Sequence, residues 1–131
     1  MRSLTFIVPG NPVPLARARV GKYSIYDSQK HEKFVATMQL SHQMAGTKTL
    51  NGPLVLEAIF FMPMGKAKRR IGKPHAFRPD LDNLIKYVCD ICTKTVFQDD
   101  CIIYRIVAQK IYDENPRTVF TLSEVGEQNG I

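Results

Sequence analysis

Residues 80–97 read DLDNLIKYVCDICTKTVF, and this stretch has the period of an amphipathic helix. Its apolar side chains recur three, four, seven and eleven residues after the first, at Leu81, Leu84, Ile85, Val88 and Cys92. Asp80 precedes them and is a residue type that favours the N-cap position. We therefore expect a helix that begins at Asp80 and buries one face.

Four β-rich runs surround this helix. The expected strands cover residues 3–8, 54–63, 101–113 and 117–125, and clusters of Pro, Gly and Asn separate them. We expect the run at 54–63 to be a central strand. Strands and helices alternate without a strict parallel repeat, which favours an α+β fold. We expect a single domain over residues 1–131, with a mixed four-stranded sheet and two main helices.

The other main helix is expected over residues 28–45, where the sequence changes to a helical period and Asp27 or Ser28 supplies the cap. Its candidate buried positions are Phe34, Val35, Met38 and Ala45. Alternate strand positions and the apolar stripe of residues 80–97 give the other core candidates. They are Leu4, Phe6, Leu54, Leu56, Phe60, Leu84, Ile85, Val88, Ile102, Ile106, Phe120 and Leu122.

The chain is basic, with 18 Lys and Arg against 12 Asp and Glu and a formal net charge of +6. Such a balance favours a polyanionic partner, nucleic acid above all, although many basic proteins bind none. Apolar residues make up 44% of the chain and charged residues 23%, which excludes the composition of a disordered protein. A chain of 131 residues can bury one substantial core.

The first residues, MRSLTFIVPG, match neither a signal peptide nor a membrane span. We therefore expect a cytoplasmic protein with no membrane partner. Cys89, Cys92 and Cys101 lie in apolar stretches, which favours free buried thiols over a disulfide. Cys89 and Cys92 form a C-x-x-C pair, but no well-spaced histidines complete a zinc site. We expect neither a zinc nor a redox role.

Two basic segments are candidates for contact with a phosphate backbone. Residues 65–79, GKAKRRIGKPHAFRP, have no apolar period, and we expect an open, mobile loop. Its basic side chains are Lys66, Lys68, Arg69, Arg70, Lys73 and Arg78, with His75 as a further charge if protonated. Residues 15–27 hold Arg17 and Arg19, whose spacing puts both guanidinium groups on one face of an extended chain. A solvated linker and an ordinary exposed hairpin are the alternatives.

Acidic residues follow the longer basic segment directly. Asp80 and Asp82 are two residues apart where loop becomes helix, so an extended start would aim both carboxylates the same way. Carboxylates bind Mg²⁺ or Mn²⁺, which neutralise a scissile phosphate and activate water. Helix capping alone also explains such a pair. The neighbouring basic segment and the later pair Asp99-Asp100 favour phosphodiester chemistry. Lys86 positions a phosphate, orients Asp82 or forms a plain helical ion pair.

The stretch RPDLDNLIKYVCDICTKTVFQDD, residues 78–100, resembles the signature of RusA-type Holliday-junction resolvases. Their pattern is an Asp-x-Asp-Asn-Leu-x-Lys helix followed by a paired Asp at the next strand. The resemblance extends more weakly to VPGNPVPLARARV, residues 8–20, and to the order of the expected elements. It implies a RusA-like fold and a Mg²⁺-dependent endonuclease that makes paired nicks in four-way DNA junctions.

The same resemblance implies roles for individual residues. It assigns catalysis to Asp80, Asp82, Lys86 and Asp100. It makes Asp80, Asp82 and Asp100 the ligands of Mg²⁺, with Mn²⁺ as a possible substitute, and Asp99 a supporting residue. Residues 95–98, TVFQ, lack the glycine that the family often has there, so Asp99 and Asp100 could exchange roles. The basic run is longer than the family's usual few arginines, which leaves the choice of DNA-contacting residues open.

A distance argument bears on assembly. A helix of about 12 to 15 residues is roughly 18 to 22 Å long, so carboxylates at its two ends cannot share an ion. Either the chain after the helix runs back along it, or a second subunit brings its acidic pair to the site. We predict a symmetric homodimer, which also suits the near-two-fold symmetry of a four-way junction. No other protein partner is implied.

The leading hypothesis is therefore a junction-resolving endonuclease of recombination and repair. The first alternative is a branched-DNA-binding protein of the same fold without cleavage, which Mg²⁺ dependence would distinguish. The second is a nuclease for other branched DNA, which comparison of a four-way junction with a matched linear duplex would separate. A basic structural domain without nucleic acid is the remaining hypothesis.

Overall fold

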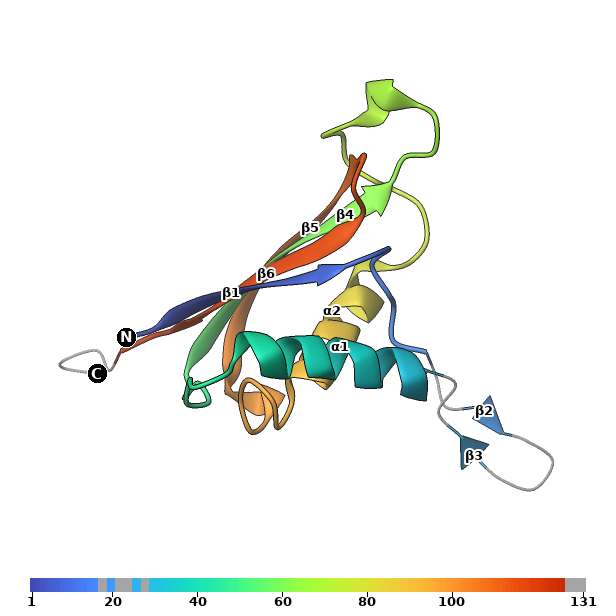
Figure 1. Cartoon of the computed structure of the whole chain (residues 1–131). Helices are drawn as coiled ribbons and strands as arrows, with labels where there is room; N and C mark the ends of the chain where they lie inside the picture. Colours follow the sequence, from blue (N-terminus) through green and yellow to red (C-terminus); the bar gives the residue numbers. More distant parts are fainter. Residues whose placement is uncertain (17–18, 21–24, 27–28, 127–131) are drawn as a thin grey trace.

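The computed structural model describes residues 1–16, 19–20, 25–26 and 29–126. Its main sheet contains β1 (Ser3–Pro9), β4 (Leu54–Pro63), β5 (Ile103–Asp113) and β6 (Arg117–Glu124). Two helices, α1 (Lys30–Gln43) and α2 (Leu81–Cys92), lie on the same face of this sheet (Figure 1). The expected α+β fold with a mixed four-stranded sheet and two main helices is confirmed.

Shorter elements lie between these. β2 (Arg19–Val20) and β3 (Ile25–Tyr26) form a small antiparallel pair that projects away from the main sheet (Figure 1). Two 3-10 helices, η1 (Lys68–Arg70) and η2 (Asp100–Ile102), occur in the segments before and after α2. Both of these segments carry candidate functional residues.

The order of strands in the main sheet is β1-β6-β4-β5. β6 pairs antiparallel with β1 and β4, whereas β4 and β5 are parallel, so β4 is internal, as expected. Two parallel strands need a crossover connection, and α2 lies on it. The start of α2 therefore lies toward the carboxyl ends of β4 and β5, and its end leads back to the beginning of β5.

The core lies between the sheet and the two helices. Side chains alternate along β4, so that Leu54, Leu56 and Phe60 face the helices and are fully buried. Phe6 and Phe120 stack on the same side of the sheet with ring centroids 5.2 Å apart. The core candidates that prove buried are Phe6, Leu54, Leu56, Phe60, Leu84, Val88, Phe120 and Leu122, while Leu4, Ile85 and Ile102 are partly buried against them.

Ile106 is a core candidate that was wrong, because its side chain is 45% exposed. It lies opposite Leu56 in the β4–β5 register and so faces the helix side. However, β5 is the outer strand of the sheet. A side chain there has a strand neighbour on one side alone, so less of its surface is covered.

The buried face of α1 was also predicted wrongly. Phe34, Val35 and Met38 are 62%, 42% and 55% exposed, and Ala45 is exposed beyond the helix end. The side chains that face the core are Ala36, Leu40 and Met44, again four residues apart. The period was therefore right and the face wrong. The helix begins at Lys30 with Gln29 at the N-cap position, and the predicted caps Asp27 and Ser28 lie outside the described residues.

The cysteines are free in the structure. Burial raises the pKa of the Cys89 thiol to about 11 and that of Cys92 well above its ordinary value, so both remain protonated at neutral pH. Cys101 is exposed, contrary to the expectation of burial, because it lies on η2 at the surface. Within the described part of the chain, no helix is long and apolar enough to cross a membrane.

Candidate metal and nucleic-acid site

Asp80 and Asp82 lie at the start of α2. Asp80 occupies the N-cap position with an extended backbone, as predicted, but its side chain makes no capping hydrogen bond. Its backbone carbonyl accepts from the amides of Asn83 and Leu84, both at 3.2 Å. The Asp80 carboxylate is therefore not used to cap the helix, which weakens the purely structural explanation of the acidic pair.

The Asp82 carboxylate faces solvent, with its side chain 70% exposed. Its Oδ1 accepts from the Asn83 amide at 3.0 Å, and its Oδ2 lies 3.8 Å from the ammonium of Lys86. The ion pair joins positions four apart on the helix and contributes a few tenths of a kcal/mol at most in such exposed surroundings. Asp80, Asp82 and Lys86 thus lie together on one exposed end of α2.

The Pro-rich segment before β2 packs against this end of the helix. The Leu15 amide donates to the carbonyl of Asn83 at 2.9 Å. Gln29, which is 8% exposed, donates to Pro14 O at 2.7 Å and accepts from the Ala16 amide at 2.8 Å. An open depression lies where this segment meets the start of α2. It is lined by Pro14, Leu15, Arg78, Pro79, Asp80 and Asn83.

Lys110 fixes the backbone of the segment on the other side of this depression. Its ammonium donates to the carbonyl oxygens of Phe77 at 2.6 Å and Pro79 at 2.7 Å. Lys110 is opposite Phe60 in the β4–β5 register, so its side chain points to the helix side of the sheet. Sequence reasoning missed this residue. A lysine at an inward position of an apolar strand was the signal that could have identified it.

The basic segment 65–79 runs along the outer edge of β5. The Gly72 amide donates to Tyr112 O at 2.9 Å, the Tyr112 amide to Lys73 O at 3.0 Å, and the His75 amide to Lys110 O at 3.0 Å. The expectation of an open loop was therefore wrong, because the free edge of β5 supplies backbone partners that outweigh like-charge repulsion. Burial, followed by the charge of Lys110, lowers the pKa of His75, so this residue adds no charge at neutral pH.

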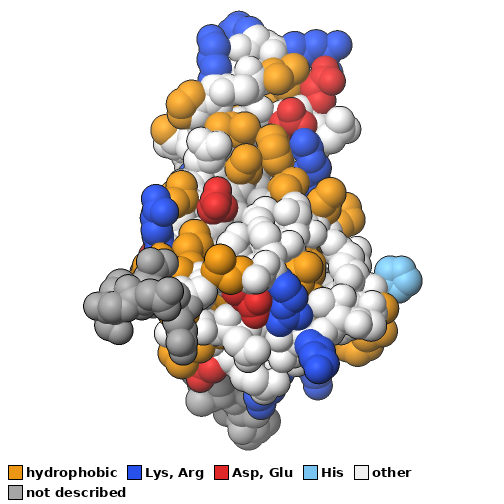
Figure 2. Space-filling view, turned by 90° about the vertical axis from the view of Figure 1, so that its left-hand side faces the viewer, with side chains coloured by type: hydrophobic (Ala, Val, Ile, Leu, Met, Phe, Trp, Pro, Cys, Tyr) orange, Lys and Arg blue, Asp and Glu red, His pale blue; other side chains and the backbone are white. Residues whose placement is uncertain are grey.

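The cations of this segment remain exposed. They are Lys66, Lys68, Arg69, Arg70, Lys73 and Arg78. Blue side chains gather at the top of Figure 2, where Figure 1 places the segment. The Arg70 guanidinium lies over the Tyr112 ring, 5.5 Å from its centroid. Of the other predicted contacts, Arg17 lies outside the described residues, and only the backbone of Arg19 is described, in β2.

The turn after α2 leads to the second acidic pair. Lys94 adopts a φ of 67°, in the region where glycine is usual, so this turn forms without the glycine typical of the motif. Asp99 is the N-cap of η2, where its Oδ1 accepts from the Cys101 amide at 3.0 Å, and this bond lowers its pKa. Desolvation, followed by the hydrogen bond with Asp99, raises the pKa of Asp100.

Asp80 and Asp100 lie at opposite ends of the crossover. The Lys110 ammonium contacts Pro79, next to Asp80, whereas Asp100 precedes Ile103, the first residue of β5. Lys110 is seven residues after Ile103, which corresponds to about 23 Å of extended strand. β5 does run back along α2, but the acidic pair stays at its far end. Among the described residues, no three His, Cys, Asp or Glu side chains are grouped closely enough to hold a metal ion.

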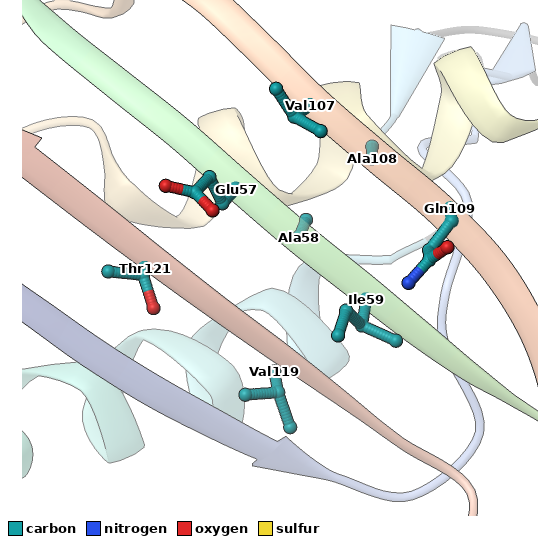
Figure 3. A pocket seen from close by; sticks show the side chains of 8 residues that line it. All are labelled: Glu57, Ala58, Ile59, Val107, Ala108, Gln109, Val119 and Thr121. Carbon is teal, nitrogen blue, oxygen red and sulfur yellow. The ribbon is translucent and has the colours of Figure 1, made fainter.

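A separate hollow lies on the open face of the sheet, away from both helices (Figure 3). Its lining comes from β4, β5 and β6 and is mostly apolar or neutral, with Glu57 as its one carboxylate. A single carboxylate beside apolar side chains does not supply the several oxygen ligands that Mg²⁺ requires. We therefore place no metal chemistry on this face.

Comparison with known proteins identifies the family. The family model described as "Endodeoxyribonuclease RusA" matches residues 9–123, a range that includes both acidic pairs and the basic segment between β4 and α2. The chain belongs to the RusA endodeoxyribonuclease family. The resemblance found in the sequence motif is thereby confirmed.

Two relatives of this RusA-family chain illustrate the match. One is the crossover junction endodeoxyribonuclease rusA of Lactococcus phage r1t, which is 34% identical over 107 residues that cover 80% of this chain and 81% of the phage protein. The other is the uncharacterized protein YqaN of Bacillus subtilis strain 168, which is 27% identical over 141 residues, 95% of this chain and 99% of the relative. Both alignments include most of the fold described above.

Proposed function

We propose that this RusA-family chain is a Mg²⁺-dependent endonuclease that resolves four-way DNA junctions by paired nicks in recombination and repair. The observation that carries the proposal is the carboxylate of Asp80, which caps nothing and lies beside Asp82 next to an exposed basic segment. The similarity to the phage crossover junction endodeoxyribonuclease supports the choice of a branched substrate.

The donors at this end of α2 are suited to a hard divalent cation. Asp80 and Asp82 offer oxygen atoms, which favours Mg²⁺, with Mn²⁺ as a substitute. When bound, the ion would neutralise the scissile phosphate and lower the pKa of a water molecule. Lys86 projects beside Asp82 and positions a non-bridging phosphate oxygen. We assign the contacts with the DNA backbone to the exposed cations of residues 66–78 and, from the sequence alone, to Arg17 and Arg19.

We further propose that a homodimer completes the ligand set. Asp100 is the third ligand, as the second aspartate of the pair is in the RusA motif, and Asp99 supports it as the N-cap of η2. Within one subunit Asp100 is too far from Asp80 to share an ion with it. In a symmetric dimer, the partner subunit's Asp100 approaches Asp80, and each subunit supplies its own Asp100 in return.

The outer edge of β5 is the surface that we assign to this interface. Tyr104, Ile106 and Val107 are 63%, 45% and 49% exposed there, which is unusual for apolar side chains on a strand edge. If two β5 strands pair antiparallel around Ile106, along the part of the edge that residues 72–75 leave free, the partner subunit's Ile103 lies opposite Gln109. The partner subunit's Asp100, on η2 just before its β5, then lies near Lys110, which holds the segment that precedes Asp80.

The experiment that tests the proposed activity compares a labelled four-way junction with a linear duplex of the same sequence, in Mg²⁺ and in chelator. Wild type is measured beside Asp80→Asn and the control Glu57→Gln, whose carboxylate lies on the open face of the sheet. We expect Mg²⁺-dependent nicking of the junction that Asp80→Asn abolishes and Glu57→Gln retains. Tight junction binding without cleavage would instead indicate a DNA-binding protein without nuclease activity. Cleavage of flaps or forks in preference to the junction would indicate a nuclease for another branched substrate.

A further inference from the structure

Phe77 is the most exposed aromatic side chain among the residues that the structure describes. It is 70% exposed, more than Tyr104 at 63% or Phe34 at 62%. Single exposed apolar side chains are common on protein surfaces, so exposure alone does not indicate a binding role. The way in which this ring is held and the charges around it carry the argument.

The exposure of Phe77 is built into the structure. Its carbonyl oxygen accepts a hydrogen bond from the Lys110 ammonium at 2.6 Å, and the same ammonium holds Pro79 O, two residues later. The His75 ring meets the Phe77 ring edge-on, with centroids 6.2 Å apart and planes at 82°. His75 packs in turn on Tyr112, at 4.8 Å between centroids. The segment is therefore fixed on both sides of Phe77 while its ring projects outward.

The electrostatic surroundings of Phe77 select a polyanion. Arg78 follows it directly, Lys73 lies four residues before it, and the guanidinium of Arg70 covers the Tyr112 ring. These cations would attract a nucleic-acid backbone. Phe77 also lies three residues before Asp80, so a strand held at the metal site passes close to its ring.

We propose that Phe77 is a stacking platform for a nucleobase displaced from the helical stack at the branch point of the junction. This inference rests on the proposed function and names the feature of the substrate that the site recognises. Every base offers a π face, so an aromatic ring can stack on it whatever the sequence. In a continuous duplex both faces of a base are already occupied. At a branch point the stack is interrupted, and the ring replaces a neighbour that is missing or easily displaced.

The test places 2-aminopurine either at the branch point of a four-way junction or well inside one arm. Its fluorescence rises when the base leaves the stack. Wild type, Phe77→Ala and Phe77→Trp are mixed with each DNA in chelator, which prevents Mg²⁺-dependent cleavage. Phe34→Ala is the matched control, because Phe34 is an exposed phenylalanine on α1, outside the basic segment.

We expect wild type to raise the fluorescence at the branch point and not in the arm. Phe77→Ala should remove most of that rise and weaken junction binding about tenfold, which is within the range for loss of one base–aromatic stack. It should weaken duplex binding by less than about twofold, since the phosphate contacts remain. Phe77→Trp and Phe34→Ala should behave like wild type.

Two results would overturn the inference while leaving the proposed function intact. One is a Phe77→Ala protein that keeps the full fluorescence rise. The other is a protein that loses affinity for junction and duplex equally, because Phe77 would then be a general contact. A wild type that shows no preference for the junction and no Mg²⁺-dependent nicking would contradict the proposed function itself, and this inference with it.

Discussion

The ammonium of Lys110 donates a hydrogen bond to the carbonyl oxygen of Pro79 at 2.7 Å, directly before Asp80. The same ammonium binds the Phe77 carbonyl at 2.6 Å. β5 is thereby fastened to the segment that enters α2, and the position of Asp80 depends on the sheet as well as on its own helix. A charged donor between two carbonyls makes stronger hydrogen bonds than a neutral one. Lys110 is therefore a positioning residue for the candidate metal site.

Replacement of Lys110 by Met should lower kcat/KM for junction cleavage by about 10- to 100-fold, because small displacements of a reacting group are costly. The Mg²⁺ concentration needed for half-maximal cleavage should rise. Lys110→Arg, which keeps a cationic donor, should restore much of the activity. An unchanged Mg²⁺ requirement in Lys110→Met would contradict the positioning role.

Asp82→Asn should abolish cleavage and preserve or tighten junction binding. Removal of a metal ligand lowers the rate by about 100-fold or more, since the ion supplies several kcal/mol of charge stabilisation. In the absence of metal, a carboxylate close to a phosphate is repulsive, so its neutralisation favours binding. Gel-shift titration in chelator and single-turnover cleavage in Mg²⁺ measure the two effects. Loss of binding together with cleavage would indicate a folding defect.

Replacement of Arg69 and Arg70 by Ala should weaken DNA binding for every sequence and reduce its salt dependence. Each lost phosphate contact lowers the slope of log K against log salt by about 0.9, so the double variant should lose about 1.8. Lys48→Ala is the control, because Lys48 lies before β4 whereas the basic segment follows it. An unchanged slope in the double variant would mean that Arg69 and Arg70 do not contact the phosphates and that the DNA-binding surface lies outside residues 66–78.

Glu124 makes the fold sensitive to acid. Its Oε2 accepts from the Arg2 guanidinium at 3.1 Å and from the Asn51 amide at 2.9 Å, and these bonds, with that of Arg2 first, lower its pKa from 4.5 to about 2. A lowered pKa in the folded state means that the ionised form is stabilised. This stability is complete above pH 4.5 and is lost as the pH falls toward 2.

Glu124→Gln should therefore reduce the free energy of unfolding by about 2 kcal/mol at pH 7, the range for hydrogen bonds to a charged group. The difference from wild type should shrink as the pH falls below 4.5. Urea denaturation midpoints over this pH range measure it, with Glu57→Gln as a control for loss of negative charge. A difference that stays constant down to pH 2 would rule out ionised Glu124 as its source.

The sequence predicts α2 and the four main strands well because their patterns are strong and local. The stripe from Leu81 to Cys92 has one apolar face, so its period also gives its orientation. α1 has apolar side chains on two faces, Phe34 and Met38 on one and Ala36 and Leu40 on the other. The larger side chains of Phe34 and Met38 suggest that their face is the buried one. The face with the small Ala36 is buried instead, because it permits close packing of the helix against the core. Pattern alone cannot make that choice.

Residues joined across long sequence separations were not predictable in the same way. Lys110 binds backbone carbonyls 33 and 31 residues earlier in the chain, and no periodicity encodes such a contact. The packing of residues 72–75 along β5 likewise follows from which strand is outermost, and sequence did not give the strand order. The separation of Asp80 from Asp100 was expected from helix length, but its cause, a parallel crossover, required the topology.

Subunit mixing tests whether the metal site is shared between two copies. Asp82→Asn and Asp100→Asn should each be inactive as homodimers. In a mixed dimer with shared sites, both substitutions fall in one site, and the other combines the intact Asp82 of one subunit with the intact Asp100 of its partner. Random exchange makes half of the dimers mixed, so about one quarter of all sites should be restored. These dimers should nick one strand of the junction without resolving it. If each subunit instead holds its own complete site, every mixed dimer carries two damaged sites and no activity returns, which would exclude the shared ligand set.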